Sequence, residues 1–328
     1  MAVLNPYEMA DFAMQIKSVS HVHPISVNPD LDQTLIDELH DLGYNHVPVS
    51  HYMPSAPYYP LADYCDVPSE MLSSPNSEKV QVRDGNANIG HYNTLGSFLT
   101  GYGQPSTGDV PGQWKDIFAQ AFVQLQYADG GGITINHPDT NTTAMFNRYC
   151  QMLDYDSRVL GIEVYNNMSE RINGAGYCAS TFIPMWDRIL ATGRQCWGFG
   201  ALDWMGETYH PLYGSNMLCC ASNEHECLKA YRDGKFYVLV KDTGIRVTSI
   251  SATAMRVKVS VTKSAHIDFV TNNGRVSYTG KEATYSPKLT DVYVRCEIVD
   301  SGDSDGIIYT QPIMMNKAKL SLITPLMC

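Results

Sequence analysis

Apolar and polar residues follow two different rhythms along the chain. In the first part, residues 32–42 place four apolar side chains at helical spacing, and Gly43 ends the predicted helix. A second helix is predicted over residues 224–233, where Gly234 closes it. Runs typical of buried strands lie at residues 16–19, 46–49, 130–135, 159–167, 196–202 and 235–240. Strands and helices are therefore expected to alternate over residues 15–235, as in α/β proteins.

After residue 240 the rhythm becomes that of an antiparallel β-structure. Short segments with apolar and polar alternation lie at residues 245–250, 255–261, 266–271, 275–278, 292–299 and 307–313. Turn-forming residues separate them, notably at 272–274 and 301–306. We therefore expect two domains, a larger one over residues 1–240 and a small antiparallel β-sandwich over residues 241–328.

Composition narrows the class of protein. At 328 residues the chain exceeds the size at which one core stops growing, and 44% hydrophobic content is ample for two cores. The net charge of −11 argues against a nucleic-acid partner. No run approaches the roughly 18 apolar residues of a membrane span, and the first residues do not resemble a signal peptide. Nine cysteines without a C-x-x-C pair indicate free thiols, so a cytoplasmic protein without a membrane partner is expected. The oligomeric state stays open.

Candidate chemistry begins at the end of the first predicted strand, in Ser20-His21-Val22-His23. Side chains two residues apart on an extended segment project to the same side, so both imidazoles can reach one metal ion. A lone H-x-H pair is a weak signal, and two surface histidines at a strand end are the alternative.

More histidines and carboxylates follow in order, most of them just after a predicted strand. They are His51, His91 in Gly90-His91-Tyr-Asn93, His137 in Asn136-His137-Pro138, Glu163 within residues 159–167, and Asp203 after residues 196–202.

This ordered set resembles the PHP (polymerase and histidinol phosphatase) family of metal-dependent hydrolases. The resemblance continues into segments typical of PHP proteins that carry a C-terminal β-domain, and so covers nearly the whole chain. These segments are Trp186–Gly193, Gly234–Tyr237, Val292–Glu297 and Tyr309–Ile313. It implies a distorted (β/α)7 barrel followed by the β-sandwich, with the site at the C-terminal ends of the barrel strands.

The resemblance also implies two or three divalent metal ions, commonly zinc, manganese or iron. The family's ligand positions fall on His21, His23, His51, His91, His137 and Asp203, and we assign catalytic roles to His51, His137 and Asp203. A carboxylate that bridges two ions is also expected. Glu78 is our choice because a Pro-Asn turn would place it at a strand end, and Asp84 is the rival.

Three departures from the family pattern bear on mechanism. Ser50 stands where the family has an aspartate, Val19-Ser20 replaces Asp-Leu, and Met205 replaces a histidine. Met205 cannot ligate a hard ion well, so one ion position is expected to be weakened unless His210 substitutes; a loop histidine outside the site is the alternative. Glu163 either supports the ligands from outside or caps its strand.

The clustered ions predict a phosphoesterase that uses a metal-activated hydroxide on a small phosphorylated substrate. Three alternatives stay open: a carboxylic or carbamate ester hydrolase of the same fold, a degenerate PHP protein that binds ligand without turnover, and a structural metal domain. Arg83, Arg148 and Arg171 are candidate phosphate-binding residues, or else solvated surface side chains.

Overall fold

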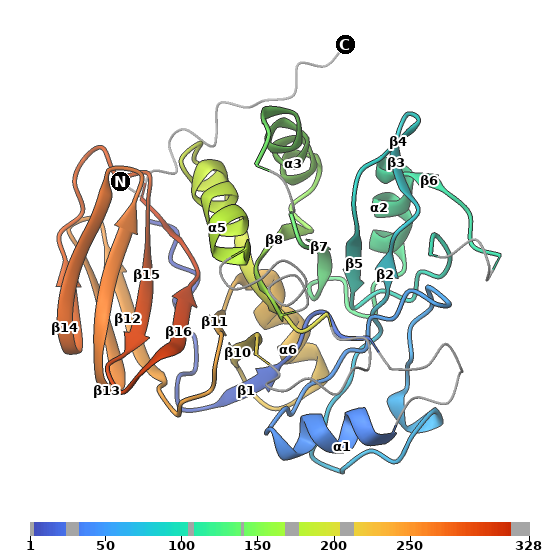
Figure 1. Cartoon of the computed structure of the whole chain (residues 1–328), viewed down its shortest axis with the longest axis horizontal. Helices are drawn as coiled ribbons and strands as arrows, with labels where there is room; N and C mark the ends of the chain where they lie inside the picture. Colours follow the sequence, from blue (N-terminus) through green and yellow to red (C-terminus); the bar gives the residue numbers. More distant parts are fainter. Residues whose placement is uncertain are drawn as a thin grey trace.

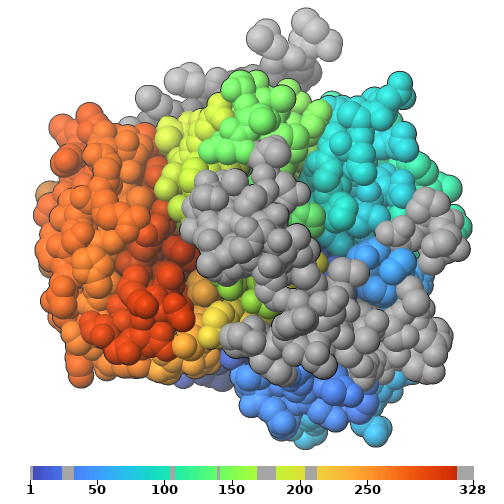
Figure 2. All heavy atoms as spheres, viewed as in Figure 1, coloured from blue at the N-terminus to red at the C-terminus, as the bar shows by residue number. Residues whose placement is uncertain are grey.

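The computed structural model describes residues 3–23, 33–103, 108–138, 141–167, 177–203 and 213–315. It is rich in β-structure, and the strands form three sheets (Figure 1). The C-terminal strands lie at one side of the molecule and helix α2 lies at the other, with α5 and α3 between them. The surface view has the same division, with residues of the C-terminal strands on one flank (Figure 2).

The largest sheet has nine strands and includes the first and the last strand of the described chain. Its order is β1-β10-β11-β16-β15-β13-β12, with β14 paired to β13 and β17 to β15, and all of these pairings are antiparallel. Its strands are β1 (Gln15–Ser18), β10 (Ser215–Cys219), β11 (Phe236–Leu239), β12 (Val247–Thr253), β13 (Arg256–Thr271), β14 (Gly274–Tyr285), β15 (Tyr293–Asp300), β16 (Asp303–Thr310) and β17 (Ile313–Met314). The predicted segments 255–261 and 266–271 are thus two halves of one long strand, β13.

The second sheet has five strands in the order β2-β5-β7-β8-β9. They are β2 (Glu78–Lys79), β5 (Tyr92–Leu95), β7 (Gly132–Ile135), β8 (Val159–Asn166) and β9 (Trp197–Ala201). The last three are parallel, whereas β2 and β5 are antiparallel to their neighbours. Every residue of these strands is buried, as expected for the near-continuous apolar runs in the sequence.

Helices connect and cover these strands. They are α1 (Gln33–Asp41), the 3-10 turn η1 (Leu61–Asp63), α2 (Trp114–Val123), α3 (Thr143–Tyr155), α5 (Tyr177–Leu190) and α6 (Glu224–Asp233). Helix α6 has the bounds that the sequence predicts. The Asn223 side chain accepts a hydrogen bond from the Glu226 N–H at its start, and Gly234 ends it with φ +73°, a conformation that favours glycine.

A small third sheet interrupts the alternation of strands and helices. Strands β3 (Val82–Asp84) and β4 (Ala87–Asn88) form a hairpin, and β6 (Gly112–Gln113) pairs with β3. The hairpin turns at Gly85-Asn86, between the paired residues Asp84 and Ala87, and Gly85 has φ +62°. Gly-Asn is a two-residue hairpin turn signal, and this tight turn explains why a helix is missing between β2 and β5.

The predicted barrel is therefore wrong. No closed barrel and no (β/α)7 arrangement exists within the described segments, because β2 and β5 run antiparallel to their neighbours and β1 pairs with β10. The predicted β-sandwich is wrong as well, since its strands continue through β16 and β11 into the nine-stranded sheet. The domain boundary at residue 240 stays a prediction.

No described helix combines the length and the apolar character needed to cross a membrane. Seven cysteines are free thiols, as the sequence predicts: Cys65, Cys150, Cys196, Cys219, Cys220, Cys227 and Cys296.

Candidate metal centre

The predicted site residues gather where the two large sheets meet. His21 and His23 follow β1, Glu78 begins β2, and His91 directly precedes β5. His137 and Asp203 follow the parallel strands β7 and β9 at their carboxyl ends. Because β5 is antiparallel to β7, with Tyr92 opposite Ile135, the start of one strand meets the end of the other. Although the barrel is wrong, these strand ends still meet at one place.

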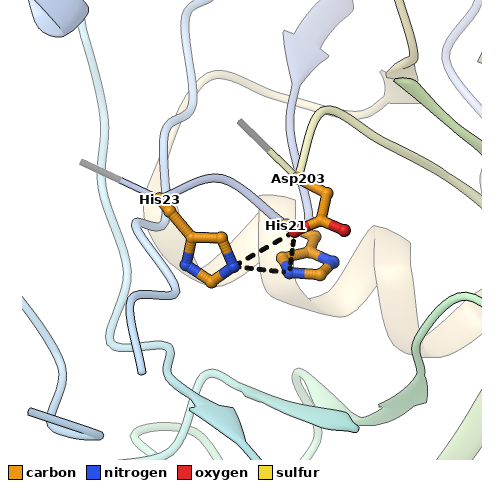
Figure 3. A group of neighbouring side chains, drawn as sticks. All are labelled: His21, His23 and Asp203. Atoms are coloured by element: carbon orange, nitrogen blue, oxygen red, sulfur yellow. Dashed lines mark hydrogen bonds and ion pairs between the residues drawn. The ribbon is translucent and has the colours of Figure 1, made fainter. Parts of the chain in front are cut away.

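One group consists of His21, His23 and Asp203 (Figure 3). The Nε2 atoms of the two histidines are 3.0 Å apart, and the Oδ1 atom of Asp203 is 3.2 Å from each of them. Both histidines are fully buried, and Asp203 is nearly so. Two imidazole nitrogens and a carboxylate oxygen converge, as around a metal ion.

The second group consists of Glu78, His91 and His137. The Oε1 atom of Glu78 lies 3.1 Å from His91 Nδ1 and 3.5 Å from His137 Nε2. Glu78 also reaches the first group, since its Oε1 is 3.4 Å from His21 Nε2 and its Oε2 is 3.2 Å from His23 Nε2. One buried carboxylate therefore stands between four imidazoles and joins the two groups.

Glu163 on β8 orients residues of both groups from outside. Its Oε1 accepts a 2.7 Å hydrogen bond from His21 Nδ1, and its Oε2 accepts the backbone N–H of His137 at 2.7 Å. Asn166, on the same strand, donates to Glu163 Oε2 at 2.8 Å and to Asp203 Oδ2 at 3.1 Å. Such carboxylate–histidine contacts fix the ring and its tautomer in metal sites.

The protonation pattern leaves lone pairs that need a cation. A carboxylate only accepts, so His21 Nδ1 carries the proton that Glu163 binds, and the neutral ring then presents a bare Nε2 to His23, Asp203 and Glu78. Either a proton or a metal ion can fill that position. The donor set thus fits a divalent ion, and both groups could hold one.

Without an ion, protons take this role. Burial lowers the pKa of His21, but the charges of Asp203, Glu78 and Glu163 raise it by more. The pKa of His21 is therefore well above its ordinary value. The pKa of His23 is raised in the same way, because hydrogen bonds to Asp203 and Glu78 outweigh burial. Burial raises the pKa of Asp203, yet the neighbouring histidines, His21 first, bring it down to about 2.

The backbone is unusual at two of these positions. His137 has φ +23° and Asp203 has φ +47°, values that non-glycine residues seldom adopt. Both residues are held by hydrogen bonds, the His137 N–H to Glu163 and the Asp203 N–H to the His21 carbonyl at 3.0 Å. Backbone strain of this kind concentrates at functional sites.

His51 lies beside the first group. Its Nδ1 is 3.4 Å from His23 Nδ1, and its Nε2 is buried without a hydrogen-bond partner among the residues described. Burial, followed by the charge of His23, lowers the pKa of His51 to about 3. The ring is therefore neutral near pH 7 and offers a lone pair. The rings of Tyr52 and Tyr58 pack against it.

A cleft opens against the second group. Its lining residues come from the β3–β4 hairpin, from β5 and β7, and from α3: Asn88, Ile89, Gly90, His91, Tyr92, Ile135, Asn136, His137, Met145 and Tyr149. His91 and His137 belong both to this lining and to the second group, so a small molecule in the cleft would touch that group.

Of the two rival carboxylates, Glu78 is the one in the cluster. Asp84 sits in the exposed hairpin and contacts Arg148 instead. Ser50 has a backbone role, since its hydroxyl donates to the Val22 carbonyl at 3.1 Å and accepts the Val22 N–H at 3.0 Å. It thereby fixes the segment between His21 and His23. Met205, His210 and Arg171 lie outside the described residues, and Arg83 lies on β3 and belongs to neither group.

Sequence reasoning missed three buried asparagines that support the site. Asn136 donates to Glu78 Oε1 and to Asn93 Oδ1, both at 2.9 Å, and Asn93 donates to the Ser20 carbonyl at 2.7 Å. Asn166 is the third. Asn136 and Asn93 belong to the motifs Asn136-His137-Pro138 and His91-Tyr92-Asn93. A polar side chain in a run expected to be buried must find hydrogen-bond partners, and this was the signal in the sequence that could have identified them.

No protein-family model, no curated protein and no solved structure matches this chain. The resemblance to the PHP family therefore stays a prediction that rests on the order of the motifs.

Proposed function

We propose that this protein is a metal-dependent phosphoesterase that acts on a small phosphorylated substrate. The observation that carries the proposal is Glu78, whose two carboxylate oxygens lie 3.1–3.5 Å from nitrogens of four histidines. A carboxylate shared between two histidine groups is the arrangement that holds paired divalent cations. It ties the two groups of the centre into one chemical unit.

The residues of the two groups would act as ligands for two metal ions. His21, His23 and Asp203 would hold one ion, His91 and His137 the second, and Glu78 both. Zinc, manganese or iron bound there would lower the pKa of a coordinated water and neutralise charge on a phosphoryl group. His137 and His91 border the cleft, which gives a substrate its route to the second group. The neutral His51 offers a buried lone pair to a third ion or to a hydrogen-bond donor of the substrate, which it would position.

Metal content and hydrolysis test the proposal together. The purified full-length chain is expected to hold about two transition ions by elemental analysis and to hydrolyse p-nitrophenyl phosphate when manganese or zinc is added. Less than one ion per chain would contradict the proposal. Turnover of p-nitrophenyl acetate far above that of the phosphate would instead favour the ester hydrolase, and bound metal without any turnover would favour a binding protein.

The variant Glu78→Gln isolates the shared carboxylate. It keeps the volume of a side chain that is 1% exposed but removes its charge. Activity is expected to fall by at least about a hundredfold, because loss of an outer partner of a ligand already costs about ten- to a hundredfold. Glu70→Gln is the matched control, since Glu70 also bonds a histidine, His40, at 2.8 Å, but on the exposed surface. Thermal unfolding of both variants separates a chemical from a folding defect.

A further inference from the structure

Next to the cleft lies an arginine, Arg148, which contacts the lining residue Met145 and has poor hydrogen-bond partners. Helix α3 contributes Met145 and Tyr149 to the cleft lining, and the β3–β4 hairpin contributes Asn88 on the opposite side. Arg148 lies on the same face of α3, because residues three and four apart are neighbours on a helix. It contacts Asp84 at the tip of the hairpin, so the Arg148–Asp84 pair spans the two walls.

The contacts of Arg148 are long and weak. Its Nε and Nη2 both approach a single oxygen of Asp84, Oδ2, at 3.5 Å, which is the limit of a hydrogen bond. Its Nη1 donates to the thioether sulfur of Met145 at 3.3 Å, and a thioether is a weak acceptor. The side chain of Arg148 is 22% exposed and that of Asp84 is 46% exposed.

Arg194, which pairs with Asp154 on the same helix α3, has strong hydrogen bonds and serves as a comparison. Arg194 donates from Nε and Nη2 to the two oxygens of Asp154 at 2.9 and 2.8 Å, in the two-point geometry that suits a carboxylate. Its side chain is 23% exposed, so exposure does not explain the difference. Arg148 therefore keeps donors in the plane of its guanidinium that no described residue satisfies well.

We infer that Arg148 binds a second anionic group of the substrate, remote from the ester that is cleaved. The inference rests on the proposed function, in which the reacting phosphate reaches the second group through the cleft, at His91 and His137. No lysine or arginine is among the described residues that line the cleft, so Arg148, which contacts the lining residue Met145, is the group that meets a distal negative charge. A carboxylate or a second phosphoryl group accepts two hydrogen bonds from the planar guanidinium of Arg148, in place of its weak contact to Asp84. The substrate class is then a phosphomonoester with a further acidic group.

Matched pairs of substrates test this directly. The metal-loaded chain is assayed with ω-carboxyalkyl phosphates and with alkyl phosphates of the same length, at several lengths. Arg148→Gln is expected to lower kcat/KM for the carboxylated substrate of best length by about ten- to a hundredfold, mainly through KM, as for loss of a charged hydrogen bond. The plain alkyl phosphates are expected to change less than about threefold. Arg194→Gln removes the same charge away from the cleft and is the control.

A binding measurement makes the inference independent of turnover. Titration calorimetry compares ω-carboxyalkyl phosphonates, which cannot be hydrolysed, with alkylphosphonates of equal length. The carboxylate is expected to tighten binding in the parent chain and to lose that advantage in Arg148→Gln. Asp84→Asn removes the competing carboxylate, so it is expected to tighten binding of the carboxylated phosphonate. The same measurement with bisphosphonates tells a phosphoryl from a carboxylate group.

The outcomes separate the inference from the proposed function. Equal losses for both members of a substrate pair, or no loss, overturn the role of Arg148 while hydrolysis still supports the function. Carboxylate-dependent binding that Arg148→Gln abolishes, without hydrolysis, supports the inference and contradicts the function. Absence of phosphonate binding in the metal-loaded chain overturns the inference.

Discussion

At the residue scale, a single buried carboxylate positions more than one candidate metal ligand. Glu163 shows this best, because its two oxygens serve different groups: Oε1 takes the ring proton of His21, and Oε2 takes the backbone N–H of His137. A single side chain on β8 thus sets the tautomer of one candidate ligand and the strained backbone of another. The second role follows from the fold alone, since residues 137 and 163 are brought together by the pairing of β7 with β8.

Replacing Glu163 by glutamine tests this dual role. An amide can accept from His21 Nδ1 through its oxygen, but its NH2 group cannot accept the His137 N–H or the Asn166 amide. We expect the affinity for manganese to fall by about ten- to a hundredfold, the usual cost of losing an outer partner. Calorimetric titration of the metal-free chain gives the affinity. An affinity equal to that of the Glu70→Gln control would show that the carboxylate has no positioning role.

A buried histidine outside the centre gives a pH prediction. His46 is fully buried, its Nδ1 is 2.8 Å from Ser18 Oγ and its Nε2 is 2.9 Å from Ser74 Oγ. Burial lowers its pKa from 6.5 to about 3. Between pH 6.5 and pH 3 His46 is protonated in the unfolded chain but neutral in the folded chain. The contribution of neutral His46 to the free energy of unfolding is therefore complete above pH 6.5 and is lost as the pH falls toward 3.

The variant His46→Gln has no titrating group at this position, so it lacks the proton uptake of His46 on unfolding. In the presence of a chelator, the difference in unfolding free energy between the parent chain and the variant should shrink by about 1.4 kcal/mol per pH unit below pH 6.5. Urea unfolding at a series of pH values measures the difference. A difference that does not depend on pH would contradict a neutral, buried His46.

At the element scale, the strand ends determine which side chains meet. Segments 159–167 and 196–202 are predictable as strands because their apolar runs are continuous, and they form β8 and β9 nearly as expected. The direction of β5 is not predictable from its own sequence, because Tyr92–Leu95 has no pattern that distinguishes parallel from antiparallel pairing. Direction is set by the β3–β4 hairpin, whose turn at Gly85-Asn86 returns the chain without a crossover helix. His91 precedes β5 rather than following it, and it still meets His137.

Helix α5 is attached to the nine-stranded sheet by a buried arginine. Arg295 on β15 has no exposed surface; its Nε and Nη2 each donate to Asp187 of α5 at 2.8 Å, and its Nη1 donates to Glu297 at 2.8 Å. The guanidinium also packs over the Trp186 ring, 4.8 Å from its centre. A sequence in which Arg295 stands alone in a β-run gives no sign of this partner, more than a hundred residues away.

Loss of Arg295 should therefore cost far more than loss of an exposed arginine. Arg295→Met leaves Asp187 without its cation and Glu297 with Arg275 alone, and it is expected to lower the free energy of unfolding by about 3 kcal/mol. Arg194→Met breaks the pair with Asp154, which has the same two-point geometry but is partly exposed, and should cost less than about 1 kcal/mol. Urea unfolding of the two variants gives both values, and equal costs would show that Arg295 is not a structural attachment.

At the scale of the whole molecule, the centre joins the two large sheets. His21 and His23 follow a strand of the nine-stranded sheet, whereas the other members belong to the five-stranded sheet. The order of ligand types along the chain predicted this grouping even though the predicted barrel is wrong. The reason is physical: a cluster needs only strand ends that converge, and more than one sheet topology brings them together. The topology itself depends on pairings between distant strands, such as β1 with β10 and β11 with β16, which local patterns do not specify.

An ion that bridges the sheets should stabilise the whole molecule, and in a pH-dependent way. Binding only to the folded chain adds RT ln(1 + [L]/Kd), about 2.7 kcal/mol at a hundredfold excess over Kd, so the melting temperature should rise with manganese and fall when a chelator is added. The raised pKa values of His21 and His23 mean that bound protons stabilise the ion-free chain until the pH rises through those values. An ion must displace these protons, so its stabilising effect should grow from pH 6 to pH 8. Thermal unfolding with manganese or chelator at each pH measures the effect, and Glu78→Gln should lose most of it while Glu70→Gln keeps it. A manganese effect that is the same in Glu78→Gln would show that the ion binds elsewhere.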